Sequence, residues 1–156
     1  MKTALTIRNA EVVLPVTTER TDVSVINGRI CAIGNEIPDV GEVIDGDGLF
    51  LLPGIIDPQV HFREPGANHK EDLHSGSCAA AAGGVTSFLD MPNNTPPVIT
   101  RQRMQEKKQL AAEKSVVNYG FFMGATPDNL EELNAAENVC GIKTVSYTHL
   151  TLPTKA

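Results

Sequence analysis

Residues 53–66 read PGIIDPQVHFREPG, and the pattern of the whole chain changes at this stretch. Before it, short apolar runs are separated by turn dipeptides such as Asn27-Gly28. After it, strand-like apolar runs alternate with helical ones, starting with a strand over 55–62. The sequence therefore predicts two kinds of structure, one in residues 1–52 and another in residues 53–144.

Residues 1–52 are predicted to form a small antiparallel β domain of the sandwich type. The dipeptide Asn27-Gly28 lies between apolar runs and is typical of a tight hairpin, because both residue types tolerate a positive φ. Strand-like runs are expected at 4–7, 11–15, 22–26, 29–33 and 42–44.

Residues 53–144 are predicted to form successive βαβ units. Strands are expected to begin near 54, 85, 116 and 139, which is the spacing of crossovers between parallel strands. Helices are expected at 71–82, at 101–114 behind a Thr100 cap, and from Pro127 behind a Thr126 cap. This α/β pattern fits a doubly wound sheet or the first half of a (β/α)₈ barrel, since a complete barrel takes about 250 residues.

Composition excludes several classes of protein. The chain has 156 residues and a formal net charge of −6, with no run of Lys or Arg, which argues against a nucleic-acid or membrane partner. No apolar run approaches the roughly 20 residues that a membrane span needs, so we expect a soluble, cytoplasmic protein. Its three cysteines, without a C-x-x-C spacing, are expected to be reduced thiols that fill the core: Cys31, Cys78 and Cys140.

The end of the first strand after Pro53 carries the candidate site. In a (β/α)₈ barrel the carboxyl ends of the strands face the active site. His61 alternates with Gln59 and Asp57, so these side chains are expected to share one side of the strand. Imidazole is the commonest metal ligand near neutral pH, which favours a metal or substrate role for His61. Asp57 and Asp90 are expected to form structural hydrogen bonds, and His69 and His74 to be exposed or to pack on a helix.

Two blocks of sequence resemble the dihydroorotases of the amidohydrolase superfamily. The first is PGIIDPQVHFREPG at 53–66, and the second is GGVTSFLDMPN at 83–93. Allantoinases resemble the same region but usually carry Asn at the position of Arg63 and Leu at that of Asn93, while hydantoinases lack both motifs. The resemblance implies a (β/α)₈ hydrolase barrel preceded by the small β domain.

The resemblance also implies roles for individual residues. It assigns His61, Arg63 and Asn93 to substrate, and Arg63 offers a planar fork for a substrate carboxylate. It assigns His61 and Lys143 to metal, expected to be one or two zinc ions, with Lys143 carboxylated in many family members. The family's His-x-His reads Gln59-Val60-His61 here, and an amide is a weaker zinc ligand than imidazole, so we do not assign Gln59 as a ligand.

The expected function is that of a dihydroorotase. This activity reversibly hydrolyses the amide ring of dihydroorotate to N-carbamoyl-aspartate in pyrimidine biosynthesis, using a metal-activated water, and the family enzyme is expected to be a homodimer. No catalytic residue is assigned, because the family's catalytic Asp is expected beyond the chain end, and this chain by itself is expected to be inactive. The alternatives are a non-catalytic dihydroorotase-like subunit, which Gln59 favours, and a related cyclic amidase of the allantoinase or hydantoinase type.

Residues 145–156 differ in character from what precedes them. They read VSYTHLTLPTKA, and the ten residues 145–154 resemble one reading frame of a transposase-type sequencing adapter. We therefore expect a non-native tail, with a genuine strand and tail as the alternative, and exclude it from functional reasoning.

Overall fold

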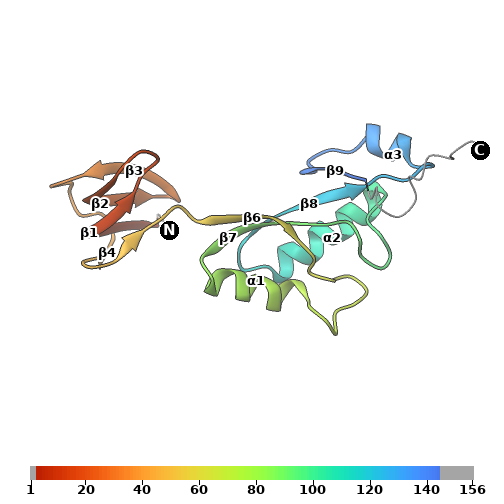
Figure 1. Ribbon diagram of the computed structural model, residues 1–156, viewed down its shortest axis with the longest axis horizontal. Coiled ribbons are helices and arrows are strands. Elements are labelled where there is room, and N and C mark those ends of the chain that lie inside the picture. Colours follow the sequence, from red (N-terminus) through yellow and green to blue (C-terminus); the bar gives the residue numbers. More distant parts are fainter. Residues whose placement is uncertain (1–2, 145–156) are drawn as a thin grey trace, which may run out of the picture. The chain divides into compact units, whose positions relative to one another are not determined.

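The computed structural model describes residues 3–144, so the tail predicted at 145–156 lies outside the described residues. The chain divides into two compact units between Pro53 and Gly54. Figure 1 shows the first as a small sheet and the second as strands that alternate with helices. Each unit has its own cluster of buried apolar side chains.

The first unit is a five-stranded sheet with the order β3-β2-β1-β4, in which β5 also pairs with β1. Asn27 and Gly28 form the predicted tight turn, with φ of 52° and 74°, between Ile26 and Arg29, which pair across the hairpin. The strands are β1 (Ala4–Val13), β2 (Thr18–Ile26), β3 (Arg29–Gly34), β4 (Glu42–Asp45) and β5 (Phe50–Leu51).

The prediction of an antiparallel first domain is only partly right. The pairs β1·β2 and β2·β3 are antiparallel, but β4 and β5 both pair with β1 in parallel. The sheet is mixed because the chain crosses from β3 to the far side of β1 instead of turning back on itself. The runs predicted at 4–7 and 11–15 are a single strand, whose pairing shifts between Ile7 and Ala10, where Asn9 has a φ of 59°.

The second unit confirms the predicted alternation of strands and helices and their parallel pairing. Its four strands lie in the order β6-β7-β8-β9, and every neighbouring pair is parallel. The elements are β6 (Ile55–Val60), α1 (Leu73–Ala82), β7 (Val85–Asp90), α2 (Arg101–Lys114), β8 (Asn118–Gly124), α3 (Leu130–Asn134) and β9 (Gly141–Lys143).

Local hydrogen bonds explain where the helices begin. Asp72 caps α1 by accepting a hydrogen bond from the Ser75 N–H at 2.7 Å, and Thr100 caps α2 as predicted. The third helix begins at Leu130 instead of Pro127, and the predicted Thr126 cap is wrong. Asn129 immediately precedes this helix. Asn129 Oδ1 accepts a hydrogen bond from the Thr126 N–H, and the Asn129 amide group donates to the Ile99 and Gly124 carbonyls. Residues 126–129 therefore form a non-helical turn that precedes α3.

The core of the second unit lies between its helices and its strands. Helices α1 and α2 contact each other and pack on β7 and β8 (Figure 1). Phe88 and Phe121 on these strands are buried, and the Phe62 ring packs on that of Phe88 at 4.6 Å. The buried apolar residues of this core are Leu73, Phe88, Val98, Met104, Ala111, Phe121 and Met123.

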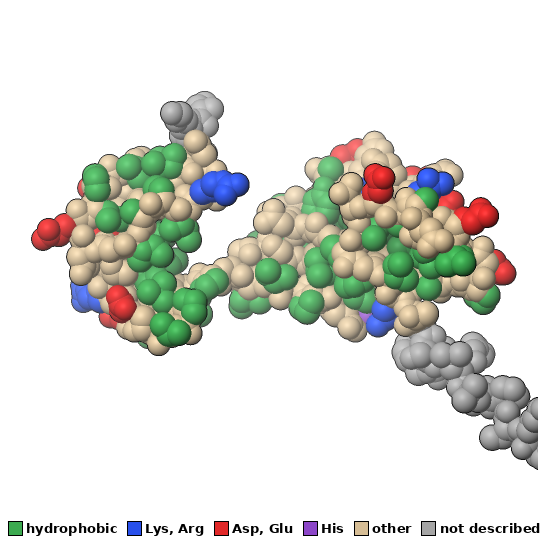
Figure 2. Space-filling view, turned by 90° about the horizontal axis from the view of Figure 1, so that it is seen from above, with side chains coloured by type: hydrophobic (Ala, Val, Ile, Leu, Met, Phe, Trp, Pro, Cys, Tyr) green, Lys and Arg blue, Asp and Glu red, His purple; other side chains and the backbone are tan. Residues whose placement is uncertain are grey.

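Both units also expose large apolar side chains, and Figure 2 shows such side chains on the visible surface of each. In the second unit they include residues of the outermost strands: Ile56 of β6 is 62% exposed, and Ile142 of β9 is 52% exposed. In the first unit Phe50 of β5 is 67% exposed. Among residues 3–144 no helix is both long enough and apolar enough to cross a membrane.

Candidate functional site

The predicted site residues follow the carboxyl ends of parallel strands. His61 and Arg63 come directly after β6, Asn93 comes shortly after β7, and Lys143 is the last residue of β9. Because the strands are parallel, these ends lie at the same edge of the sheet. We call residues 61–72 the first loop and residues 91–99 the second loop.

A bulge in β6 sets the direction of the first loop. Asp57 pairs with Phe88, whereas Val60 pairs with Asp90, so β6 holds one extra residue between these pairs. The predicted alternation from Asp57 through Gln59 to His61 is therefore interrupted, and a shared side for these three side chains does not follow. Bulges of this kind re-aim side chains next to active sites.

The structure brings two of the predicted residues together. His61 Nδ1 lies 2.8 Å from Asn93 Oδ1, and both side chains are exposed. Because the amide oxygen accepts, the proton of the neutral imidazole is on Nδ1. The hydrogen bond thus leaves a lone pair on His61 Nε2 and leaves the Asn93 amide group free to donate.

Arg63 lies at a strained backbone position with an exposed side chain. Its φ is +26°, and a hydrogen bond joins the Glu64 N–H to the Phe62 carbonyl around it. Among residues 3–144 the guanidinium has no hydrogen-bond or ion-pair partner. Strain of this kind persists only where the surroundings hold it, and it is concentrated at functional sites.

Direct backbone contacts join the two loops. The Met91 N–H donates to the Val60 carbonyl at 3.0 Å, and the Thr95 N–H donates to the Pro65 carbonyl at 3.2 Å. Gly66 has a φ of 108°, and a Cβ at this position would overlap the Thr95 carbonyl. The two loops are therefore in direct contact at residues 65 and 66 of the first and Thr95 of the second.

Beneath the loops lies a set of buried polar side chains that the sequence analysis did not single out, apart from Asp90. We call Glu64, Asp90, Asn94 and Lys107 the buried polar group; Lys107 and Asp90 are each 1% exposed. Lys107 Nζ lies 2.7 Å from Asp90 Oδ2 as an ion pair without hydrogen-bond geometry. It donates hydrogen bonds to Asn94 Oδ1 at 2.7 Å and to the Met91 carbonyl at 3.2 Å.

The rest of the buried polar group holds the first loop. Glu64 accepts hydrogen bonds from the Leu73 N–H at 2.9 Å and from Asn68 at 2.8 Å, and its carboxylate pairs with Lys114. The Asn94 amide donates to the Glu64 carbonyl at 2.8 Å. Asp90 Oδ1 accepts from the Phe62 N–H at 3.1 Å, so Asp90 has the structural role predicted for it.

Burial and charge act in opposite directions on Lys107. Burial lowers the pKa of Lys107, because it disfavours the charged form, and Asp90 opposes this effect. The Phe121 ring, 4.7 Å from Nζ, adds a cation–π contact. A signal in the sequence could have revealed this residue, since Lys107 is at helical spacing with the buried Met104 and Ala111.

The described residues do not by themselves complete a metal site. Within residues 3–144 no three His, Cys, Asp or Glu side chains converge as a metal site would require. His61 Nε2 has the free lone pair of a ligand, but its neighbour two residues earlier is Gln59, an exposed amide. Lys143 is half-buried, and its carbonyl accepts from the Ala125 N–H at 2.9 Å.

Among the described residues, no hydrogen bond joins the remaining candidates to His61, Arg63 or Asn93. His69 and His74 are exposed, as predicted, and His74 Nδ1 lies 3.1 Å from the Lys114 carbonyl. The prediction that the cysteines fill the core is wrong, because all three are exposed free thiols. Cys31 lies on the edge strand β3, Cys78 on the outer side of α1 beside His74, and Cys140 next to the last strand.

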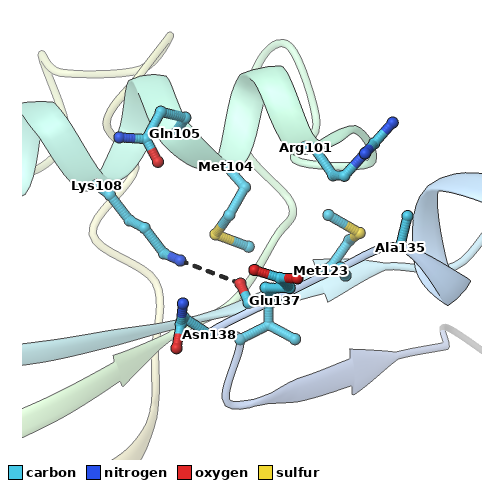
Figure 3. A pocket seen from close by; sticks show the side chains of 10 residues that line it. Arg101, Met104, Gln105, Lys108, Met123, Ala135, Glu137 and Asn138 are labelled. Carbon is cyan, nitrogen blue, oxygen red and sulfur yellow. Dashed lines mark hydrogen bonds between the residues drawn. The ribbon is translucent and has the colours of Figure 1, made fainter.

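A separate cavity of about 330 Å³ lies between α2 and residues 135–139 (Figure 3). Met104 and Met123 line it, and Lys108 donates a hydrogen bond across it to the Glu137 carbonyl at 3.4 Å. None of the predicted site residues lines this cavity.

The family follows from a comparison with known proteins. The model of the amidohydrolase family matches residues 50–146, which include both loops and every predicted site residue. The chain belongs to the amidohydrolase family. Within this family it is similar to an allantoinase from Deinococcus radiodurans, 41% identical over 144 residues, and to a dihydroorotase from Methanosarcina acetivorans, 43% identical over 114 residues.

Solved structures of amidohydrolases share the same architecture. The chain superimposes on a D-hydantoinase with a TM-score of 0.78 at 29% identity, covering 95% of this chain and 34% of that one. An L-hydantoinase from Arthrobacter aurescens gives a TM-score of 0.77 over 88% of this chain and 32% of that one. The two curated relatives named above align over 91% and 72% of this chain. The chain spans only 32% and 24% of their own lengths.

Proposed function

We propose that this chain is the N-terminal part of a dihydroorotase, which interconverts dihydroorotate and N-carbamoyl-aspartate. The observation that carries the proposal is the hydrogen bond between His61 and Asn93 beside Arg63, three residues whose chemistry suits a carboxylate-bearing cyclic amide. The similarity to a dihydroorotase at 43% identity supports the same assignment.

Each of the three residues has a distinct task in the proposed reaction. Arg63 projects an unpaired, permanently charged fork that can bind the substrate carboxylate through two hydrogen bonds. Asn93 adds an amide donor to the same anion, because its oxygen is already used by His61. Fixing the carboxylate also fixes the orientation of the ring amide, so the bound substrate is already aligned for hydrolysis.

We infer that the whole enzyme binds zinc and that His61 and Lys143 supply two of its ligands. His61 Nε2 offers the lone pair, and Lys143 becomes an oxygen ligand if its amine is carboxylated. Zinc would polarise the amide carbonyl and activate water. The described residues do not complete a metal site by themselves, and we propose that other parts of the whole enzyme supply the remaining ligands.

An allantoinase is the second candidate, and a specific comparison favours it. The allantoinase from Deinococcus radiodurans is 41% identical over 91% of this chain. Allantoin carries no carboxylate on its ring, so an allantoinase gives Arg63 no anionic group to bind. We prefer dihydroorotase to allantoinase because Arg63 is exposed and unpaired among the described residues and can bind a substrate carboxylate.

The experiment begins with the gene. Sequencing genomic DNA across codon 144 establishes the natural continuation, and the whole protein is then expressed and assayed with dihydroorotate, N-carbamoyl-aspartate, allantoin and hydantoin. We expect turnover of the first two and a zinc content that falls with chelation, in parallel with activity. Turnover of allantoin instead would establish the second candidate. A folded protein without zinc or turnover would identify a non-catalytic subunit, to which Gln59 points.

Substitution of Arg63 tests the basis of the choice. Arg63→Ala should lower kcat/KM for dihydroorotate by about 100-fold, since hydrogen bonds to a charged group are each worth about 1.5–3 kcal/mol. Arg29→Ala, which removes an exposed arginine of β3, is the matched control and should leave kcat/KM unchanged. Equal activity of both variants would contradict the proposed role of Arg63. We also propose that the whole enzyme is a homodimer, which light scattering would test.

A further inference from the structure

We propose that Lys107 is a positioning residue for substrate binding, which acts from helix α2 by fixing both loops through the buried polar group. This inference rests on the proposed function, because it concerns how that site is held in its binding geometry. Lys107 itself is buried and does not reach the exposed face that His61 and Asn93 present.

The Lys107 ammonium holds the second loop at two points. Its hydrogen bonds reach the Met91 carbonyl at 3.2 Å and the Asn94 side chain at 2.7 Å. These two residues enclose Pro92 and Asn93, so the loop is held before Asn93 through a backbone carbonyl and after it through the Asn94 side chain. With both flanking residues held, Asn93 presents its side chain to His61.

Two further hydrogen bonds carry this constraint to the first loop. Asp90, paired with the ammonium, accepts from the Phe62 N–H at 3.1 Å. Asn94, also bonded to the ammonium, donates to the Glu64 carbonyl at 2.8 Å. Phe62 and Glu64 are the two neighbours of Arg63, so the chain is held by one hydrogen bond on each side of the residue with the strained φ of +26°.

A purely structural role explains this arrangement poorly. A buried ion pair costs desolvation energy, and replacing it by apolar side chains of similar volume is often neutral or stabilising. Here a long cation extends from a helix on one side of the strands to the loops at their carboxyl ends. An apolar residue at position 107 would fill the same space but would leave the Met91 carbonyl and Asn94 Oδ1 without a donor.

The test uses the whole enzyme and compares Lys107→Met with Met104→Ala. Met104 is equally buried one turn earlier on α2 and belongs to the apolar core, so its truncation lowers stability without touching the buried polar group. We expect Lys107→Met to raise KM for dihydroorotate about tenfold with a smaller change in kcat. This corresponds to about 1.4 kcal/mol, within the range of energies that couple neighbouring residues. Met104→Ala should leave KM unchanged.

A double-mutant cycle separates positioning from general destabilisation. If Lys107 acts through Arg63, Lys107→Met has little further effect on KM once Arg63→Ala is present, whereas independent effects multiply. Full multiplication of the two effects, or equal KM changes in Lys107→Met and Met104→Ala, would overturn the inference.

Hydrogen–deuterium exchange gives a readout that does not depend on the substrate. Lys107→Met should accelerate amide exchange in residues 61–66 and 91–95 more than in the rest of the second unit, while Met104→Ala should accelerate exchange in these segments and in the rest of the unit alike. If the unsubstituted enzyme fails to turn over dihydroorotate, the proposed function fails, and the kinetic arm is run with the cyclic amide that it does hydrolyse. Unchanged exchange in both loops would overturn the inference with any substrate.

Discussion

The two units each contain a cation that joins distant segments, but they surround it differently. In the first unit Arg8 pairs with Asp22 and Asp39, whose side chains are 12% and 57% exposed. In the second unit Lys107 pairs with Asp90, and both side chains are 1% exposed. The same kind of ion pair therefore has water as an alternative partner in one unit and none in the other. This difference decides how much each unit loses when the pair is broken.

The Arg8 cluster supports an irregularity in β1. Asp22 accepts a hydrogen bond from the Asn9 N–H at 2.9 Å, at the point where β1 and β2 lose regular pairing. This hydrogen bond, and then the Arg8 guanidinium, lower the pKa of Asp22 against the opposing effect of burial. The Arg8 cluster and the buried polar group thus have a similar role. The first holds Asn9 and the second holds the segment around Arg63, and both of these residues have a positive φ.

Breaking the buried pair should have the largest effect on stability. Lys107→Met leaves Asp90 as an unpaired buried carboxylate and should lower the opening free energy of the second unit by about 3 kcal/mol. Adding Asp90→Asn removes the unpaired charge while keeping an acceptor for the Phe62 N–H, and should recover more than half of the loss. Native-state hydrogen exchange of residues 85–124 in the whole protein measures both. A larger loss in the double variant would contradict the electrostatic cause.

Breaking the partly exposed Arg8 cluster should cost less. Asp22→Asn removes the charge opposite Arg8 but keeps an oxygen for the Asn9 N–H, so the opening free energy of the first unit should fall by only about 1 kcal/mol. Exchange of amides in residues 4–26 reports it. Asp47→Asn removes the partner of Arg20 in a pair whose side chains are 57% and 60% exposed, and should change nothing measurable. A loss as large as that of Lys107→Met would mean that burial does not separate the two clusters.

The contribution of Asp22 to the stability of the first unit should depend on pH. The pKa of Asp22 is lower in the folded protein than its ordinary value of 3.8, so the unfolded chain binds the proton first as the pH falls. The contribution of Asp22 is therefore complete above this value and is lost as the pH falls through the lowered pKa. Exchange in the first unit, compared between Asp22→Asn and the unsubstituted protein, should converge at low pH. A constant difference at every pH would contradict this linkage.

Salt should produce the smallest difference. At about 1 M sodium chloride the screening length is about 3 Å, so the partly exposed Arg8 pairs weaken while the Lys107 pair, which solvent does not reach, is unaffected. The opening free energy of the first unit should fall slightly relative to that of the second. Potassium chloride at the same concentration is the control for a specific ion effect. Equal changes in both units would show that the two environments do not differ.

Local chemistry made much of the fold predictable. The Asn27-Gly28 hairpin, the Thr100 cap and the Gly83 end of α1 depend on backbone preferences of one or two residues, and all three occur where the sequence indicates. The alternation of strands and helices after Pro53 is likewise a periodic signal, and it also predicted the parallel pairing.

Features set by distant contacts were not predictable. The parallel pairing of β4 with β1 arises because the chain crosses from β3 past β2 and β1 to the far edge of the sheet, and no turn motif in the sequence indicates this crossing. Thr126 and Pro127 have the composition of a helix start, but Asn129 binds the backbone of the preceding turn and delays the helix. Cys31 and Cys140 are exposed because they lie at or beside edge strands, and Cys78 because it lies on the outer side of α1; sequence alone reveals none of these positions.

The candidate site shows the same division. The motif places His61, Arg63 and Asn93 after strand ends, where the structure has them, and the contact of His61 with Asn93 fits the roles inferred from resemblance. The bulge in β6 was invisible, because it is defined by pairing with Phe88 and Asp90 on the next strand. The role of Lys107 could not follow from α2 alone, since its partners come from β7 and the two loops.

The close approach of the two loops restricts what evolution or a mutagenesis library can do at one position. At Gly28 the backbone needs a positive φ but the space around it is open, so an asparagine could replace glycine there at small cost. At Gly66 the volume of a single methyl group is already occupied by Thr95. A library randomised at both sites would therefore return several residue types at 28 and glycine alone at 66, which makes position 66 a marker for intact loop packing in any variant of this chain.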